Sequence, residues 1–169
     1  LRVSDSSLDF KDWLQGRVTR HLARDIGDFV VYRADHVYAY HLACAVDDAE
    51  QGVTDVVRGA DLIDSTPRQI YLQQLLGLST PAYLHLPVAL SDSGMKLSKQ
   101  TLAQPVDMHC PAKTIHAVLG FLGQQPPAEL ARLTPREAMQ FAQRHWSRER
   151  LPHAIALRAA RGHTATGVP

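Results

Sequence analysis

Short apolar runs alternate with helical patterns in the first part of the chain, and this order restricts the fold more than any other feature of the sequence. Each run is rich in β-branched or aromatic residues, which predicts a strand. The segment 38–46 is rich in Ala and Leu and predicts a buried helix. Alternating strands and helices are typical of a parallel α/β sheet, because each helix carries the chain back to start the next strand. The runs lie at 29–32, 53–57 and 83–87, the last extended by 88–90.

The helix between the second and third runs has sequence signals at both ends. Thr66 is placed to cap it, Pro67 suits its first position, and Gln69 stands where a capping box has Glu or Gln. Gly77 follows the last apolar residues of this segment and is a natural stop. No element is predicted in residues 1–28, which are polar and mixed.

Beyond about residue 105 the sequence predicts helices only. One begins near Pro111 and is broken by the Gln- and Pro-rich stretch 124–127. Another begins with a second capping-box signal at Thr134 and runs to about Trp146. We therefore expect an α/β domain over residues 1–105, a small helical domain over 106–160 and a disordered tail over 161–169.

Composition excludes little. The chain has 169 residues, 45% of them hydrophobic and 21% charged, which is enough to form an apolar core. The formal net charge is +1, so a surface that binds a polyanion must be local. No apolar run approaches the roughly 20 residues that cross a membrane. Cys44 and Cys110 are isolated in sequence, so no zinc site is readable, and two lone thiols suit a reducing compartment.

The stretch Lys96-Leu97-Ser98-Lys99 is the most informative about chemistry. It follows a predicted strand and a Gly turn, and two lysines three residues apart can follow the phosphates of a nucleotide during displacement. A solvated surface loop has the same composition, so a nucleotide-binding role for the stretch needs support from other features. Arg58 and Asp61 lie just past the end of a predicted strand, at the edge where parallel sheets bind ligands.

Four stretches in a fixed order carry a resemblance to a known family: RGAD, STPRQI, YLHLP and KLSK. Together they resemble the second half of the catalytic fold of the glutamyl- and glutaminyl-tRNA synthetases, over about residues 28–100. The resemblance implies the C-terminal half of a class I synthetase Rossmann-like nucleotide-binding domain, followed by a small helical segment. It also implies L-glutamate, tRNA and ATP as ligands, the ATP with Mg.

Within this family the resemblance is nearest to the glutamyl-Q tRNA(Asp) synthetases, which lack the anticodon-binding domain. Ala60 and Leu62 stand where ordinary glutamyl-tRNA synthetases usually carry Glu and His, and Gln100 stands where they usually carry Arg. The tail after the KLSK stretch is too short for an anticodon-binding region. This branch implies activation of glutamate with ATP and transfer to the queuosine base of tRNA(Asp), by a cytoplasmic enzyme that is a monomer at full length.

Two residues match the family's glutamate-binding positions. Tyr40 matches a Tyr whose hydroxyl hydrogen-bonds the substrate, and Arg58 matches an Arg that suits a carboxylate through two charge-assisted hydrogen bonds. Without the resemblance, Tyr40 reads equally well as a core aromatic residue. Arg58 then reads as a strand-end surface charge, with Asp61 orienting its loop.

The ATP site is expected at the KLSK stretch. Lys99 matches the family's ATP-binding lysine, Lys96 flanks it, and both are catalytic candidates. Ser98 and His85 are further candidates for contact with ATP. A half-buried His whose ring is satisfied by protein groups is the alternative interpretation of His85.

Two family features do not occur in this chain. The HIGH-like motif and the Cys-rich zinc-binding segment belong to the half of the fold that precedes these stretches, so we expect a fragment that holds half a site and is inactive by itself. We expect no metal ligand here and a zinc site only in the missing half. The alternatives are a fragment of an ordinary glutamyl-tRNA synthetase, a synthetase-derived binding module without catalysis, and an α/β domain unrelated to both.

Overall fold

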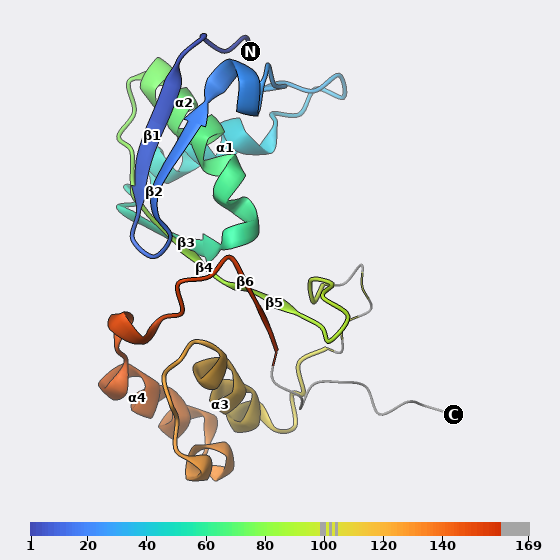
Figure 1. Ribbon diagram of the computed structural model, residues 1–169, viewed down its shortest axis with the longest axis vertical. Coiled ribbons are helices and arrows are strands. Elements are labelled where there is room, and N and C mark those ends of the chain that lie inside the picture. The colour runs from blue at the N-terminus through green and yellow to red at the C-terminus, as the bar shows by residue number, and fades with distance from the viewer. Residues whose placement is uncertain (99–100, 102, 104, 160–169) are drawn as a thin grey trace. The chain divides into compact units, whose positions relative to one another are not determined.

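An antiparallel hairpin opens the chain in the computed structural model, which describes residues 1–98, 101, 103 and 105–159 (Figure 1). Its strands are β1 (Ser7–Asp12) and β2 (Gly16–His21), joined by a turn at Gly16, whose φ is 80°. The sequence predicted no element here. Leu8 and Val18 are buried while their chain neighbours are exposed, which is the alternation of buried and exposed residues typical of a strand. Each strand has too few apolar residues for this alternation to be recognised in the sequence.

The described chain forms two compact units, Leu1–Leu86 and Pro87–Pro169. The division falls earlier than the boundary expected near residue 105. The strand that follows Pro87 pairs inside the second unit, which places the lysine-bearing stretch there as well. The predicted tail 161–169 lies outside the described residues.

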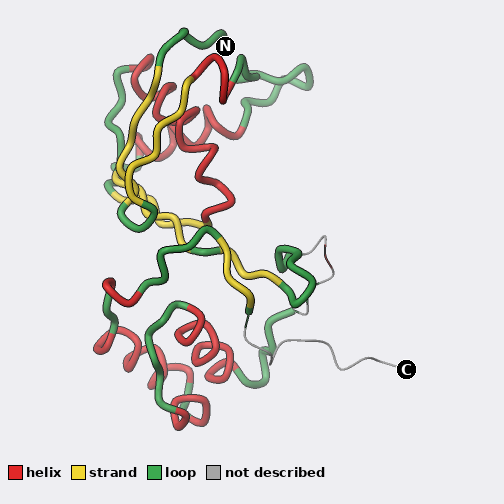
Figure 2. The backbone as a smooth tube through the Cα atoms, in the orientation of Figure 1, coloured by secondary structure: helices red, strands yellow, loops and turns green. Residues whose placement is uncertain are grey.

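A four-stranded sheet of order β2-β1-β4-β3 organises the first unit (Figure 2). The strands β3 and β4 are parallel, as the alternating pattern predicts, and β1 joins β4 at the single pair Asp12↔Tyr83. The apolar run 29–32 is not a strand: only Tyr32 forms an isolated bridge, to Tyr38. The two parallel strands are β3 (Asp55–Gly59) and β4 (Ala82–Leu86).

The helices predicted around this sheet are present. They pack against each other, and α2 also lies against β1. The core joins Leu8 of β1, Leu22, Ile70 of α2 and Tyr83 of β4. At Gly77 the φ of 67° ends α2 at the predicted residue. The bounds are η1 (Leu22–Ile26), α1 (Tyr40–Glu50), η2 (Ala60–Ser65) and α2 (Thr66–Leu76).

The predicted capping box at the start of α2 is wrong. Thr66 has helical backbone angles, Ser65 takes the N-cap position, and no side chain caps the helix. The short helix η2 runs straight into α2, so the Thr66 amide already donates to the carbonyl of Ile63. The Thr66 hydroxyl is therefore available for another partner, and Gln69 is buried rather than exposed as a cap.

The second unit combines the predicted helices with a two-stranded parallel sheet of β5 and β6. The sheet is a correction to the prediction of helices only beyond about residue 105, because β6 is three residues long and too short to show an alternating pattern. The capping box predicted at Thr134 and Glu137 forms, with both of its hydrogen bonds present. Its core joins Ala112, Leu119, Leu130 and Ala138. In the described ranges, no helix is long and apolar enough to cross a membrane. The bounds are β5 (Val88–Leu90), α3 (Pro111–Phe121), η4 (Ala128–Arg132), α4 (Pro135–His145), η5 (Arg148–Arg150) and β6 (Ala156–Arg158).

Two left-handed glycines give a matched test of this packing. At Gly77 an added Cβ would meet nothing, so Gly77→Ala should cost only the left-handed backbone penalty, about 1–2 kcal/mol. At Gly123, with φ of 73°, the Cβ would overlap the carbonyl oxygen of Arg150. Gly123→Ala should therefore lose a further ~1–3 kcal/mol. Amide hydrogen exchange in α2 and α3 measures the two effects, and equal losses would contradict the close contact.

Candidate functional site

The parallel register of β3 and β4 places Arg58 directly opposite His85. Partnered residues on neighbouring strands point to the same face of a sheet, so the two side chains meet. The Nε of Arg58 donates to Nε2 of His85 over 3.0 Å. The guanidinium also lies over the ring of Tyr83, 5.4 Å from its centre, because Tyr83 precedes His85 by two residues and shares its face.

Asp12 holds the other side of the His85 ring. Its Oδ2 lies 2.6 Å from Nδ1 of His85, and both side chains are fully buried. Its Oδ1 accepts the backbone amides of Leu14, Gln15 and His85 over 2.9, 2.8 and 3.3 Å. Burial raises the pKa of Asp12, but these hydrogen bonds, led by that from Gln15, outweigh it, and the pKa is lowered.

The protonation of His85 follows from its neighbours. A guanidinium can only donate, so Nε2 of His85 must accept the bond from Arg58, and the ring proton must sit on Nδ1, facing Asp12. The ring is therefore neutral. Burial is the largest influence on the pKa of His85 and lowers it, against the opposing pull of Asp12.

Thr66 fixes a second point on the guanidinium. Its hydroxyl accepts from Nη2 of Arg58 over 2.8 Å, and the Leu62 carbonyl lies 3.5 Å from the same nitrogen. One edge of the fork, Nε and Nη2, is thus occupied by protein. Among the described residues, Nη1 of Arg58 has no hydrogen-bond partner and no carboxylate forms an ion pair with Arg58. The Nη1 end of the guanidinium, which carries a full positive charge, can therefore bind an anion.

Tyr40 lies within electrostatic reach of Arg58. It begins α1, and Cys44 and Asp48 follow on the same helix face at successive four-residue steps. A hydrogen bond with Cys44 is the main cause that raises the pKa of the Tyr40 hydroxyl, and burial adds to it, while the charge of Arg58 acts in the opposite sense. The side chain is 53% exposed, so it is not the core aromatic residue of the alternative interpretation.

The lysine-bearing stretch lies in the second unit. Leu90 bridges to Lys96, and the Leu97 amide donates to the Ala89 carbonyl over 2.9 Å, so a tight turn brings the stretch back onto β5. The Thr101 hydroxyl lies 3.0 Å from the Ser98 amide and 2.8 Å from the Lys96 carbonyl. Lys99 lies outside the described residues. Because Arg58 and this stretch both follow predicted strands, the sequence predicts that Tyr40, Arg58 and the 96–100 loop converge on one concave face, and this stays a prediction.

The burial of His85 does not match the predicted contact with ATP. No part of its side chain is exposed, and both ring nitrogens have protein partners. The ring is fully rather than half buried, and it contacts Arg58 through Nε2. Two members of this network, Asp12 and Thr66, were not expected to be functional. The only sequence signal for Asp12 is its alternation with Leu8 and Phe10, and Thr66 was assigned to a cap.

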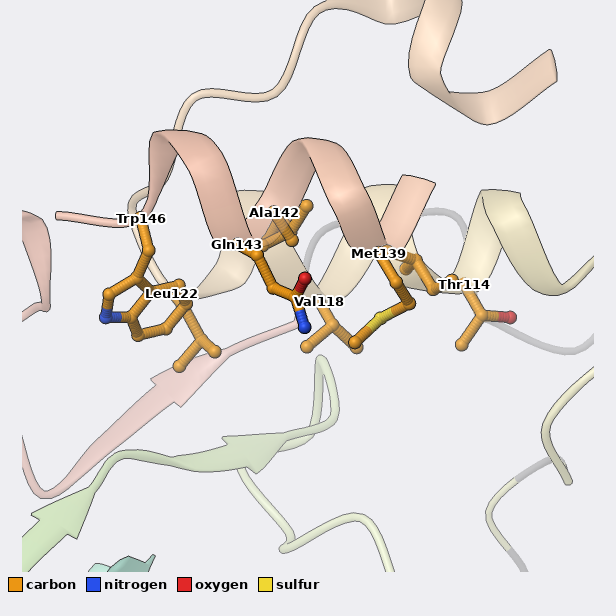
Figure 3. A pocket seen from close by; sticks show the side chains of 9 residues that line it. Thr114, Val118, Leu122, Met139, Ala142, Gln143 and Trp146 are labelled. Carbon is orange, nitrogen blue, oxygen red and sulfur yellow. The ribbon is translucent and has the colours of Figure 1, made fainter. Parts of the chain in front are cut away.

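A pocket lies between α3 and α4 (Figure 3). It has a volume of about 390 Å³ and is lined mostly by apolar side chains, among them Val118, Leu122, Met139 and Trp146. The side chains that line it include none with a charge, so it offers no acid, base or anion-binding group. Within the described ranges, no three His, Cys, Asp or Glu side chains are placed to hold a metal ion.

Comparison with known proteins identifies relatives of the chain. A family model described as tRNA synthetases class I (E and Q), catalytic domain, matches residues 2–131. A glutamyl-Q tRNA(Asp) synthetase of Pseudomonas aeruginosa is 49% identical over 93% of this chain and 54% of its own length. One from Aromatoleum aromaticum is 53% identical over 89% of this chain and 48% of its own length. The chain thus spans about half the length of these relatives.

Solved structures show a similar fold. The crystal structure of a glutamate tRNA ligase from Elizabethkingia meningosepticum, in complex with its amino acid, superposes with a TM-score of 0.68 at 22% identity, over 92% of this chain and 34% of that one. A glutamate-tRNA synthetase from Elizabethkingia anophelis gives 0.69 at 22% identity, over 94% and 35%. The resemblance and the fold class expected from the sequence are confirmed.

The buried neutral ring of His85 predicts acid sensitivity. Folding lowers its pKa from the ordinary 6.5, and Asp12, Arg58 and Asp61 are the charges that act on it. The unfolded chain then binds the proton more readily, so the stabilising contribution is complete above about pH 6.5 and is lost as the pH falls below it. His41, whose pKa burial also lowers, adds a loss of the same sign.

Urea unfolding between about pH 7.5 and about pH 5.5 measures this loss. His85→Gln should reduce the fall in unfolding free energy across that range. His109→Gln, at an exposed position, serves as the matched control. An identical fall in His85→Gln and the unaltered chain would contradict a neutral buried ring.

Proposed function

Because the chain belongs to the class I tRNA synthetases of the glutamate and glutamine group, we propose that it supplies the amino acid site and the ATP-binding loop of a glutamyl-Q tRNA(Asp) synthetase. The observation that carries the proposal is the Nη1 end of Arg58, which has no partner among the described residues while Nε and Nη2 are held by His85 and Thr66. The family resemblance pairs this guanidinium with the Tyr40 hydroxyl. Such a pair suits an anionic ligand that also has a hydrogen-bonding group.

The proposed reaction begins with the activation of glutamate. A carboxylate oxygen of glutamate attacks the α-phosphate of ATP, the bond to pyrophosphate breaks, and glutamyl-adenylate forms. The attacking carboxylate cannot at the same time be held tightly by Arg58, so Arg58 binds the other carboxylate of the substrate. Tyr40 orients the substrate through its hydroxyl. Positioning of this kind supplies much of the rate in phosphoryl and nucleotidyl transfer.

The lysine-bearing stretch is proposed to serve the phosphates. Lys96 and Lys99 carry positive charge to the pyrophosphate as negative charge shifts onto it, and Ser98 adds a hydroxyl donor. ATP is expected to arrive with Mg, which would further neutralise the phosphates.

The molecule that receives the glutamyl group distinguishes the proposal from its main alternative, an ordinary glutamyl-tRNA synthetase. Ala60, Leu62 and Gln100 differ from the residues usual in ordinary glutamyl-tRNA synthetases, and the named relatives are glutamyl-Q tRNA(Asp) synthetases. The second step is therefore attack by a queuosine hydroxyl of tRNA(Asp) on the glutamyl carbonyl, which releases AMP. The intact KLSK stretch disfavours a binding module without catalysis.

The test uses the whole protein that contains this chain. Labelled glutamate should be transferred in an ATP-dependent manner to tRNA(Asp) that carries queuosine, and not to the same tRNA with guanosine at that position. Transfer to the 3′ end of a glutamate tRNA would favour the ordinary synthetase. Failure to form glutamyl-adenylate, measured by glutamate-dependent ATP–pyrophosphate exchange, would favour the binding module.

Arg58→Lys should impair the use of glutamate far more than the use of ATP. Lysine keeps the charge but loses the planar fork, and one lost charge-assisted hydrogen bond costs about 1.5–3 kcal/mol. That corresponds to a roughly 10- to 150-fold fall in kcat/KM for glutamate. Arg17→Lys, on the exposed hairpin, is the matched control. Unchanged glutamate kinetics in Arg58→Lys would return Arg58 to a structural role.

A further inference from the structure

Three buried polar side chains converge on Arg58, and the proposed chemistry uses none of them directly. Asp12 is 1% exposed, while Thr66 and His85 are not exposed at all. They come from β1, from the first residue of α2 and from β4. Groups of this kind are costly to bury unless they are satisfied. His85 and Thr66 each accept a hydrogen bond from the guanidinium of Arg58, and Asp12 holds the His85 ring from its other side.

We propose that Asp12, His85 and Thr66 are positioning residues that fix the guanidinium of Arg58 and keep its Nη1 end open for a substrate carboxylate. The inference rests on the proposed function for the identity of the ligand, but the geometric part stands on its own. A guanidinium held at Nε and at Nη2 can rotate neither about its last bonds nor out of its plane. The Tyr83 ring, 5.4 Å from the guanidinium, limits movement toward that side.

The direction of each hydrogen bond is set from the backbone outward. Three backbone amides hold Oδ1 of Asp12, which leaves Oδ2 to accept the proton of His85 Nδ1. The lone pair of His85 Nε2 then points at Arg58 Nε, and the Thr66 hydroxyl accepts from Nη2. Both acceptors for Arg58 are therefore in place before any ligand binds, so the guanidinium is preorganised.

The network also leaves the positive charge of Arg58 uncompensated by a neighbouring carboxylate. Its two side-chain partners, an imidazole and a hydroxyl, are both neutral, and the buried carboxylate of Asp12 lies on the far side of the His85 ring. A carboxylate placed directly on Arg58 would orient it equally well, but it would compensate the charge that the substrate needs. Orientation by neutral acceptors is therefore suited to a site for an anion.

Asp12→Asn tests the chain of contacts directly. The three backbone amides require the Asn oxygen at the Oδ1 position, so its NH2 group would face Nδ1 of His85. The ring proton would then move to Nε2, where it opposes the Nε–H of Arg58. Nitrogen-15 NMR of the 169-residue chain should show His85 protonated at Nδ1, with a slowly exchanging Arg58 Nε–H. In Asp12→Asn the tautomer should switch, and the Nε–H should exchange rapidly.

Thr66 provides a second pair of variants should Asp12→Asn not fold. Thr66→Val removes the hydroxyl with little change of shape, and Thr66→Ser restores it. In the whole protein, Thr66→Val should raise the KM for glutamate about tenfold or more, as expected for one lost bond to a charged group, with the KM for ATP nearly unchanged. Thr66→Ser should recover most of the loss. Thr80→Val, in an exposed loop, is the matched control.

The outcomes separate this inference from the proposed function. A slowly exchanging Arg58 Nε–H that is unaffected by Asp12→Asn would overturn the positioning network. A Thr66→Val protein with unchanged glutamate KM, while Arg58→Lys impairs glutamate use, would overturn it as well. If Arg58→Lys itself leaves glutamate kinetics unchanged, the assignment of the ligand fails, and the NMR experiment still decides whether Asp12 and His85 position Arg58.

Discussion

The hydrogen bond from Arg58 to a neutral His85 is the interaction on which the first unit depends. It requires the imidazole to be deprotonated at Nε2, which in turn requires a partner for the proton on Nδ1, and Asp12 is that partner. Three strands must therefore be in register at one place: β1 supplies the carboxylate, β4 the ring and β3 the guanidinium. Removing one member of such a buried group leaves another unsatisfied, which typically costs several kcal/mol.

This dependence explains why the N-terminal hairpin belongs to the site although it carries no ligand-binding candidate. The strand β1 ends at Asp12, and the turn that follows supplies the amides of Leu14 and Gln15 to the carboxylate. Gln15 also donates from its side chain to the His85 carbonyl over 2.9 Å. The hairpin thus holds the carboxyl end of β4, which carries His85, the hydrogen-bond partner of Arg58. The same contacts therefore support both the fold and the geometry of the site.

Local signals in the sequence were sufficient for most of the helices. Periodic apolar residues, Gly77 and the capping box at Thr134 lie within a few residues of the structure they specify, so α1, α2, α3 and α4 were found. The same reasoning failed where strands carry few apolar residues, as in the hairpin. It also failed for the run 29–32, which was predicted to be a strand. In the described chain this run pairs only through the isolated bridge from Tyr32 to Tyr38, so its β-forming residues are not enough to make a strand.

The sequence by itself determined the family, the parallel strands, and the position of Arg58 near the carboxyl end of a strand, because these follow from short motifs and local periodicity. Only the tertiary structure decided what surrounds Arg58. Asp12 and His85 are separated by 73 residues, and a buried polar pair leaves no pattern in either segment. Thr66 shows the same limit: its sequence context indicates a cap, yet the hydroxyl turns inward because η2 already satisfies the helix start and Nη2 of Arg58 lies 2.8 Å away as a donor.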